Sequence, residues 1–185
     1  MKNISKSAKI SKQTKMIGTC KIGDNVVIYG DCYLQDCEIE NGTTVRSCYV
    51  ISSKIGRNST IGPYAHIREN SVIGDNVRVG NFVEIKKSFI GDGTKIAHLT
   101  YIGDCTVGKN CNFGCGSVIC NYDGKQKHQT EIGNNVFIGS NVNLIAPIKI
   151  DDNSFIAAGS TVTKNVQKDT FVIARAKQQE KPKRG

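Results

Sequence analysis

Branched apolar residues recur every six positions through nearly the whole chain, and this period constrains the fold more than any other feature. Between residues 55 and 85 the step of six has no slip, with Ile55, Ile61, Ile67, Ile73, Val79 and Ile85 as the key positions. Single steps of five interrupt the series elsewhere, and upstream we take Ile51 as a key position. A period of six fits neither the 3.6-residue repeat of a helix nor the two-residue alternation of a half-buried strand. An internal repeat of this kind indicates a solenoid.

Three hexads complete one turn of about 18 residues around a triangular prism, whose coils stack about 4.8 Å apart. We name its faces A, B and C after Ile55, Ile61 and Ile67. The pattern predicts an all-β fold of about nine coils over residues 1–163, followed by a C-terminal strand and a basic tail over 164–185. It resembles the left-handed parallel β-helix of hexapeptide-repeat proteins, and the hand is taken from that resemblance because parallel crossovers are normally right-handed. Small residues four places after each key position should fill the rest of the core, among them Ser59, Ala65, Thr94 and Thr106.

One interruption of the repeat is an insertion. The key positions Ile119 and Ile132 are thirteen residues apart instead of six, so the segment between them carries about seven extra residues. In a solenoid such an insertion leaves the prism on one side, and inserted loops often bind ligands. We therefore predict an extended loop over residues 120–131.

Composition excludes several other classes of protein. Aromatic residues make up 6% of the chain and Trp is absent, which argues against a core of large aromatic side chains. No apolar run approaches the roughly 18 residues that span a bilayer. The lysine-containing N-terminus lacks the apolar segment of a signal peptide, so we expect a cytoplasmic protein that does not bind membranes. The eight cysteines show no CxxC spacing and are expected to be reduced, mostly as small core residues.

The net charge of +9, from 25 basic and 16 acidic residues, favours anionic partners. Nucleic acid is not expected among them, since the charge is scattered and no basic face carries aromatic residues. A metal site is not expected either. The three histidines, His66, His98 and His128, occupy different positions of the repeat, and no cysteine pair has ligand spacing.

Stacking brings residues 17 or 18 apart into columns. One column lies two places after each face-B position and contains Pro63, Asn81, His98, Cys115, Ser140 and Ala158. An imidazole followed by three small residues over three coils, roughly 15 Å, predicts a groove along the prism with a base at one end. A pantetheine arm has that reach. The alternative is that small residues occupy this column only because they suit a corner.

Two more columns flank the face-C positions. Arg68, Lys86 and Gly103 form the first, and because two stacked cations repel by roughly 1 kcal/mol even in water, we expect a phosphate between them. The alternative is that both side chains splay into solvent. His66, Glu84 and Tyr101 form the second column, which supplies a carboxylate able to fix the tautomer of a nearby histidine.

Several motifs resemble, in order from Ile55 to Arg175, the acetyltransferase half of a bacterial bifunctional family. They read IGPYAHIR, VGNFVEIKKS, AHLTYIGD, FGCGSVICNYDGKQKHQTEIG, VFIGSNVNLIAP and AAGSTVTKNV. The family is that of the N-acetylglucosamine-1-phosphate uridyltransferase / glucosamine-1-phosphate N-acetyltransferases. The resemblance implies acetyl transfer from acetyl-CoA to the amine of glucosamine 1-phosphate, for UDP-N-acetylglucosamine synthesis, with no metal needed for the transfer. It also implies a homotrimer whose active sites lie between subunits.

The resemblance also implies roles for individual residues. His98 matches the general base and Glu84 the carboxylate that orients it. The expected phosphate ligands are Arg68, Lys86 and Lys127, the last acting on a neighbouring subunit's groove. The expected sugar and amine contacts are Tyr101, Asn112, Asn121 and Tyr122. The expected CoA contacts are Cys115, Ser140, Ala158 and Arg175.

The chain also departs from the family. Repeat begins at the first residues, so we expect the uridyltransferase activity on another chain or on a missing N-terminal domain. Cys115 stands where the family has Ala, and the tail lacks the family's aromatic ending, so Lys181 is not counted as a CoA contact. Two alternatives remain open. The acceptor could be another phosphorylated or nucleotide-linked amino sugar, or the chain could be an inactive scaffold or regulatory subunit, which would need none of the residues named above.

Overall fold

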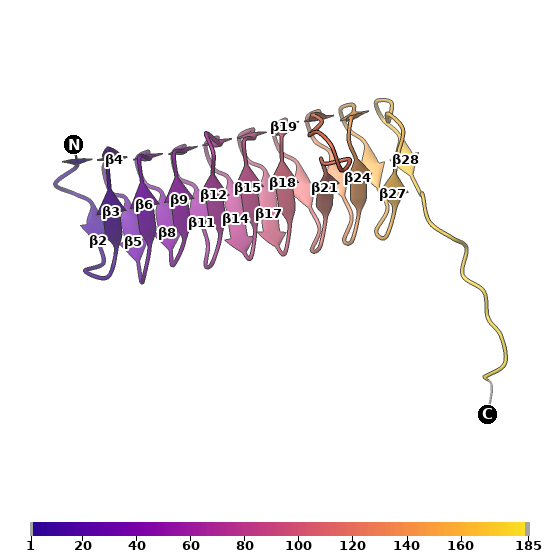
Figure 1. The fold of residues 1–185 in the computed structure, drawn as a ribbon, viewed down its shortest axis with the longest axis horizontal. Helices are drawn as coiled ribbons and strands as arrows, with labels where there is room; N and C mark the ends of the chain where they lie inside the picture. The colour runs from indigo at the N-terminus through magenta and orange to yellow at the C-terminus, as the bar shows by residue number, and fades with distance from the viewer. Residues whose placement is uncertain (1, 184–185) are drawn as a thin grey trace.

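The computed structural model describes residues 2–183, and they form a triangular solenoid built from 28 short strands. The coils stack along one axis from the N-terminal end to the C-terminal end (Figure 1), and the described part of the chain contains no helix. No helix long and apolar enough to cross a membrane is therefore found in these residues. The all-β prediction is confirmed.

Every third strand in chain order pairs in parallel, which gives one sheet for each face of the prism. Face A consists of β1 (Lys2–Ile4), β4 (Cys20–Ile22), β7 (Glu38–Ile39), β10 (Lys54–Ile55), β13 (Val72–Ile73), β16 (Phe89–Ile90), β19 (Cys105–Val107), β22 (Thr130–Ile132) and β25 (Ile148–Ile150). Face B consists of β2 (Lys9–Ile10), β5 (Val27–Tyr29), β8 (Thr44–Arg46), β11 (Thr60–Ile61), β14 (Arg78–Asn81), β17 (Lys95–His98), β20 (Asn112–Phe113), β23 (Phe137–Ile138), β26 (Phe155–Ile156) and β28 (Phe171–Val172). Face C consists of β3 (Lys15–Ile17), β6 (Tyr33–Gln35), β9 (Tyr49–Ile51), β12 (His66–Arg68), β15 (Glu84–Lys86), β18 (Tyr101–Gly103), β21 (Val118–Cys120), β24 (Asn143–Ile145) and β27 (Thr161–Val162).

This strand order, together with the hexapeptide repeats, is the left-handed parallel β-helix that the period predicts. Each coil contributes one large aliphatic side chain from each face to the core, as Ile55, Ile61 and Ile67 do with no exposed surface. Small buried residues such as Ser59 fill the space between them. The core is therefore one thin layer per coil, which explains the low aromatic content.

All eight cysteines are free. Six are buried in the core, Cys120 is half-buried, and Cys115 is exposed on the surface. Burial raises the pKa of the Cys48 thiol to about 11, so this thiol stays protonated at neutral pH. The expectation that most cysteines are small core residues is confirmed.

Two positions of the predicted register are wrong. Val50, and not Ile51, is the buried key residue of β9, since it pairs with Ile67 and has no exposed surface. Likewise Cys105 fills the core before Val107, while Thr106 is exposed. Both errors occur at steps of five, where the missing residue shifts the buried position by one.

The predicted end of the solenoid at residue 163 is too early. Val166 forms a parallel bridge with Ile150, and β28 pairs with β26, so the strand expected in 164–185 continues the prism. Nine complete coils and most of a tenth are present, compared with the predicted nine. Ala174 still accepts the Thr161 N–H, and residues 176–183 then leave the prism as a tail without strands (Figure 1). The last two residues of the predicted tail lie outside the described residues.

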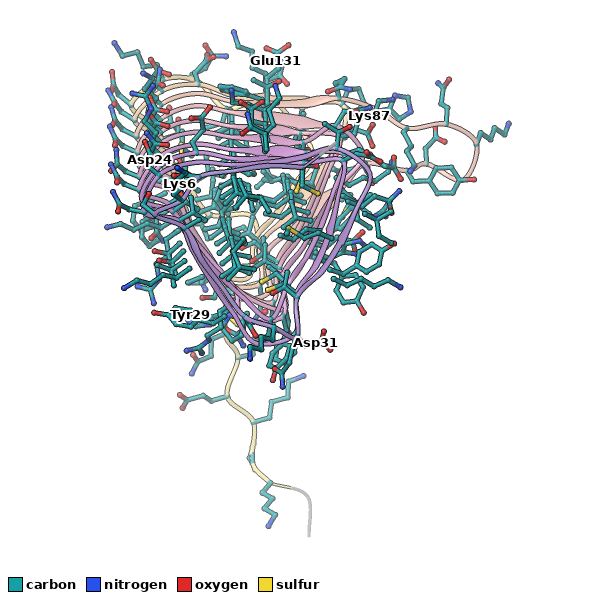
Figure 2. All side chains as sticks on the ribbon, turned by 90° about the vertical axis from the view of Figure 1, so that its left-hand side faces the viewer. Lys6, Asp24, Tyr29, Asp31, Lys87 and Glu131 are labelled. Carbon is teal, nitrogen blue, oxygen red and sulfur yellow. The ribbon has the colours of Figure 1, made fainter. Side chains whose placement is uncertain are left out.

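The three corners of the prism have different surroundings (Figure 2). The A/B corner, at Asp24, carries a ladder of Asp and Asn side chains that cap the next coil, as Asn41 Oδ1 does for the Asp24 N–H at 2.8 Å. The B/C corner lies between Tyr29 and Asp31, and the C/A corner lies at Lys87, beside the inserted loop. At the A/B corner, capping bonds therefore link successive coils along the prism.

Candidate active site

The predicted groove column lies along the B/C corner. β14 and β17 align Asn81 with His98, and the carbonyls of His98, Cys115 and Ser140 each accept an N–H bond from the following coil. The side chains of His98, Cys115, Ser140 and Ala158 are all exposed. An imidazole and three small side chains therefore follow one another along this corner.

His98 is held by Asn81. Its Nδ1 lies 2.5 Å from Asn81 Oδ1, and because an amide oxygen can only accept, Nδ1 carries the proton and Nε2 keeps its lone pair. Glu84, the carboxylate expected to orient His98, instead accepts two bonds from Arg68, from Nε at 2.8 Å and Nη2 at 2.7 Å. No bond between Glu84 and His98 is found among the described residues. The role of Asn81 is not predicted from the sequence, although its position one coil before His98 in the same column is a signal for it.

On the N-terminal side of His98 lies a groove of about 510 Å³. Its wall includes Pro63, Asn81 and the stacked rings of Tyr64 and Phe82, whose centroids are 5.7 Å apart. Tyr64 and Phe82 both have positive φ, of 59° and 56°, a region that bulky residues rarely adopt. The imidazole thus lies at one end of an aromatic-walled groove.

The same corner continues on the C-terminal side of His98. Side chains are small here, and a Cβ at Gly139 would collide with the backbone of Ala158. Arg175 closes this stretch, since its Nη1 donates to the Ala158 carbonyl at 2.7 Å. Cys115, Ser140 and Ala158 thus form a strip of small exposed side chains between His98 and Arg175.

The second group of predicted residues lies at the C/A corner. β12 and β15 align Arg68 with Lys86, as predicted. Within the chain itself three carboxylates already relieve the repulsion between them, and the expected phosphate stays a prediction. Glu84 and Glu69 bind Arg68, while Glu69 and Asp104 lie 3.4 and 3.6 Å from Lys86 Nζ. Glu69 and Asp104 directly follow Arg68 and Gly103 in the sequence, which was the signal for them.

A buried polar network holds Lys86. Lys86, Asp104 and Asn121 are only 5%, 2% and 5% exposed. Asn121 Nδ2 donates to Asp104 Oδ2 at 2.7 Å and lies 3.4 Å from the Tyr101 hydroxyl. Buried charges are tolerated only when paired and hydrogen-bonded, so this network fixes the ammonium of Lys86 in place.

The inserted loop leaves the prism at this corner (Figure 2). It is folded on itself, with a bridge between Tyr122 and Lys127 and with Asp123 Oδ1 accepting the N–H groups of Lys125 and Gln126 at 2.7 and 2.8 Å. Tyr122 is 60% exposed and its hydroxyl donates to the Gly124 carbonyl.

The loop also brings Lys127 against Lys86 of the same chain. The neighbouring ammonium of Lys86 lowers the pKa of Lys127, while Lys86 keeps its proton beside Glu69 and Asp104. One chain therefore assembles Arg68, Lys86 and Lys127 at one corner. That Lys127 acts on a neighbouring subunit's groove stays a prediction.

Within one chain the predicted site residues therefore lie in two groups. The C/A corner and face C hold Arg68, Glu84, Lys86, Tyr101, Asn121 and Lys127. The B/C corner holds His98, Cys115, Ser140, Ala158 and Arg175, and Asn112 lies half-buried on the adjoining face B. Tyr122 lies on the loop.

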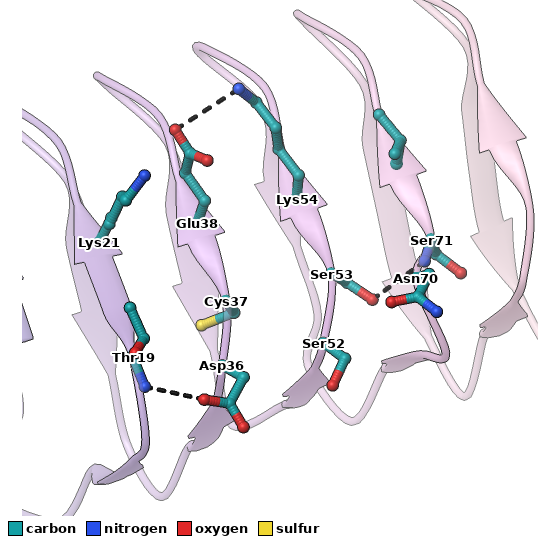
Figure 3. A pocket seen from close by; sticks show the side chains of 11 residues that line it. Thr19, Lys21, Asp36, Cys37, Glu38, Ser52, Ser53, Lys54, Asn70 and Ser71 are labelled. Atoms are coloured by element: carbon teal, nitrogen blue, oxygen red, sulfur yellow. Dashed lines mark hydrogen bonds and ion pairs between the residues drawn. The ribbon is translucent and has the colours of Figure 1, made fainter. Parts of the chain in front are cut away.

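A separate groove of about 510 Å³ opens on the N-terminal coils (Figure 3). Its polar groups already bind one another, as Lys54 does with Glu38 at 3.5 Å and Asp36 with the Thr19 N–H at 2.8 Å. None of the predicted site residues lies there. In the described part of the chain, no group of three or more His, Cys, Asp and Glu side chains is placed to hold a metal ion.

Two sequence-family profiles match the chain. The GMPPB C-terminal domain matches residues 2–81, and the bacterial transferase hexapeptide (six repeats) matches 87–121 and 129–164, leaving out the inserted loop. Among curated proteins, the bifunctional protein GlmU of Clostridium beijerinckii is 54% identical over 87% of this chain and 35% of its own length. That of Clostridium perfringens is 57% identical over 76% of this chain and 31% of its own length. The chain thus spans about a third of these relatives.

Among solved structures, the UDP-N-acetylglucosamine acyltransferase of Francisella novicida gives a TM-score of 0.51 at 19% identity, over 88% of this chain and 62% of that one. The corresponding enzyme of Campylobacter jejuni gives 0.50 at 19% identity, over 93% and 71%. At this identity the likeness supports the β-helical fold alone.

Proposed function

We propose, on the premise that this chain is a hexapeptide-repeat β-helix similar to about a third of the bifunctional GlmU proteins, that it is a glucosamine-1-phosphate N-acetyltransferase. It would transfer acetyl from acetyl-CoA to the sugar amine and form N-acetylglucosamine 1-phosphate for UDP-N-acetylglucosamine synthesis. We place this reaction in the cytoplasm and assign the uridyltransferase step to a separate protein or domain.

The observation that carries the proposal is the bond between Asn81 and His98 Nδ1, which leaves Nε2 free as a base at the end of a groove. In the proposed reaction the amine nitrogen attacks the thioester carbonyl while His98 Nε2 takes the amine proton. A C–N bond forms, the C–S bond breaks, and the proton leaves with the CoA thiolate. Backbone N–H groups would stabilise the oxyanion that forms between these steps.

The cations of the C/A corner support a phosphorylated acceptor. Arg68, Lys86 and Lys127 would bind its phosphate, since guanidinium and ammonium groups are the donors that phosphates prefer. Tyr101 and Asn112 would hold the sugar hydroxyls, with Asn121 and Tyr122 beside the amine. Glu84 would act by fixing the guanidinium of Arg68, in place of its expected role at His98.

The strip of small side chains beyond His98 supports CoA as the acetyl carrier. Cys115, Ser140 and Ala158 would line the pantetheine arm, and Arg175 would meet the CoA phosphates. The exposed thiol of Cys115 fits beside such an arm.

The separation of the two groups on different corners supports a homotrimer. A closed ring of three prisms would bring the B/C corner of one chain against face C of the next, so that each site draws on two chains. In a single chain the base and the phosphate ligands lie at different corners.

The direct test is to incubate the purified chain with acetyl-CoA and a panel of amino sugars and to measure the free CoA thiol released. We expect release with glucosamine 1-phosphate and little with glucosamine. His98→Ala should lower turnover at least a hundredfold, as loss of a general base does, while His128→Ala serves as the matched control on the loop. If no sugar causes release of CoA thiol, the proposal is contradicted and the alternative of an inactive scaffold or regulatory subunit is favoured.

One observation favours a second acceptor class. The groove on the N-terminal side of His98 includes Arg46 and Arg78 besides the stacked rings of Tyr64 and Phe82. Two guanidinium groups beside aromatic rings suit a nucleoside diphosphate. Preferential acetylation of a nucleotide-linked amino sugar in the same panel would support this alternative.

A further inference from the structure

Glu69 spans the two cations between which the acceptor phosphate is expected. One carboxylate oxygen pairs with Arg68 Nη1, and the other lies 3.4 Å from Lys86 Nζ. A phosphate held by Arg68 and Lys86 would offer its oxygens to the same two donors. The side chain of Glu69 therefore stands where the ligand anion would bind.

The other two carboxylates of this corner are held more firmly. Asp104 is 2% exposed and accepts the amide of Asn121 at 2.7 Å. Glu84 lies on strand β15 and takes the Nε and Nη2 donors of Arg68, which leaves the Nη1 side of the guanidinium for Glu69. Glu69 lies in a turn and its side chain is 49% exposed, so it is the carboxylate that can leave without opening the core.

The turn that carries Glu69 is unusual among the C/A corners around it. Six positions separate its flanking key residues Ile67 and Ile73, whereas five separate Val50 from Ile55 and Ile85 from Ile90. The extra residue gives two successive positive φ angles, 53° at Glu69 and 60° at Asn70, where neighbouring C/A turns have one such residue. A longer turn gives the Glu69 side chain room to move towards solvent.

We propose that Glu69 is an internal anion that occupies the phosphate position of the acceptor site and must be displaced when a phosphorylated ligand binds. The site then selects anions that bind both Arg68 and Lys86 more strongly than a tethered carboxylate does. Weaker anions are excluded because they cannot displace Glu69. The proposal rests on the proposed function only in taking Arg68 and Lys86 as the phosphate ligands.

The test measures binding of inorganic phosphate by isothermal titration calorimetry to the full chain, without acetyl-CoA. Glu69→Gln should bind phosphate about tenfold more tightly than the unmodified chain, since the competing carboxylate is gone. Glu131→Gln removes the same charge from an exposed site on β22 of face A and should leave the affinity unchanged. Equal or weaker binding by Glu69→Gln, or no phosphate binding by either chain, would overturn the proposal.

A second variant separates displacement from a general effect of charge. Glu69→Asp keeps the charge but is one methylene shorter, so it cannot reach both cations from the same turn. We expect it to bind phosphate more tightly than the unmodified chain, as Glu69→Gln does. If Glu69→Asp instead binds like the unmodified chain, the nearby charge and not the bridge sets the affinity, and the proposal fails.

Acetyl transfer gives an independent readout. With glucosamine 1-phosphate as acceptor, Glu69→Gln should lower KM by a factor similar to its gain in phosphate affinity. A chain that shows the gain in phosphate affinity but acetylates no sugar would leave Glu69 as an internal anion and contradict the proposed function. Acetyl transfer by a Glu69→Gln chain whose phosphate affinity is unchanged would support the proposed function and contradict the role of Glu69 as an internal anion.

Discussion

The contact between Asn81 and His98 shows how a single amide can decide which end of an imidazole is basic. Because Asn81 Oδ1 fixes the proton on Nδ1, the lone pair is on Nε2, where an acceptor amine would arrive. The same role is often filled by a carboxylate, which would also stabilise the charged ring. A neutral amide orients the ring without adding that stabilisation.

Replacing Asn81 therefore tests orientation separately from binding. We expect Asn81→Ala to lower kcat on the order of tenfold, a part of the roughly 10²–10⁴-fold that a general base supplies, because the ring loses its preferred tautomer. KM for the phosphorylated acceptor should change little, since the phosphate ligands lie at another corner. Steady-state kinetics of acetyl transfer measure both. A rise in KM with unchanged kcat would contradict the assignment.

His66 lies on face C with its Nε2 buried and, within the described residues, without a hydrogen-bond partner. Burial lowers the pKa of His66, and nearby Arg68 adds to the effect, although Glu84 opposes it. Above about pH 6.5 the ring is neutral in both folded and unfolded chains. As the pH falls below that value, the unfolded chain takes up the proton before the folded chain does. The free energy of unfolding therefore decreases as the pH falls, until the lowered pKa of His66 in the folded chain is reached.

His66→Phe should remove this loss while keeping the edge-on contact with Tyr49, whose ring centroid is 6.0 Å away. We expect the Tm of the unmodified chain to fall more steeply between about pH 7 and pH 5 than that of the variant. Thermal unfolding followed by circular dichroism at each pH gives the comparison. Parallel Tm curves would show that His66 does not titrate in this window.

At the scale of the strand, the period of six located nearly every buried residue, because each face needs one large aliphatic side chain per coil. It failed where a corner lost a residue. Upstream of Ile55 two spacings are possible, and only the neighbouring coil decides between them, since Val50 packs beside Ile67. A local pattern cannot supply that choice.

The register of β9 can be tested by a matched pair of substitutions. Val50→Ala should destabilise the chain by about 2 kcal/mol, since it removes fully buried carbon atoms and leaves a cavity. Ile51→Ala should cost less than about 1 kcal/mol, because Ile51 is only half-buried on the outer surface. Urea unfolding at equilibrium measures both. The opposite order would return the register to the one expected from the sequence.

The loop shows a different limit of sequence reasoning. Its position and length follow from the gap between Ile119 and Ile132, but its direction does not. Only the folded chain shows that Lys127 turns back to Lys86. Similarly, stacking predicted that Arg68 and Lys86 are neighbours. Two of the three carboxylates that balance them, Glu69 and Asp104, come from turns, where side chains have no fixed direction in the repeat.

At the scale of the whole molecule, the two groups of site residues lie at different corners of one prism, which makes sharing between chains testable. Arg68→Ala and His98→Ala chains should each be nearly inactive alone. Unfolded together in equal amounts and refolded, they should recover activity in about a quarter of the sites, where an intact His98 meets an intact Arg68 from a neighbouring chain. Activity staying at the level of the separate variants would mean that each chain supplies its own complete site.

The direction of the backbone hydrogen bonds has a further consequence for this molecule. In the three sheets these bonds run along the prism axis from one coil to the next, and the first and last coils lie at opposite ends of that axis (Figure 1). A force that pulls the ends apart would load the bonds of the outermost coil first. That coil would peel away before its neighbour, and each event would lengthen the chain by about 55 Å, the contour of about 18 extended residues less one stacking distance. Under tension the protein would therefore unfold one coil at a time, from the ends of the prism inwards.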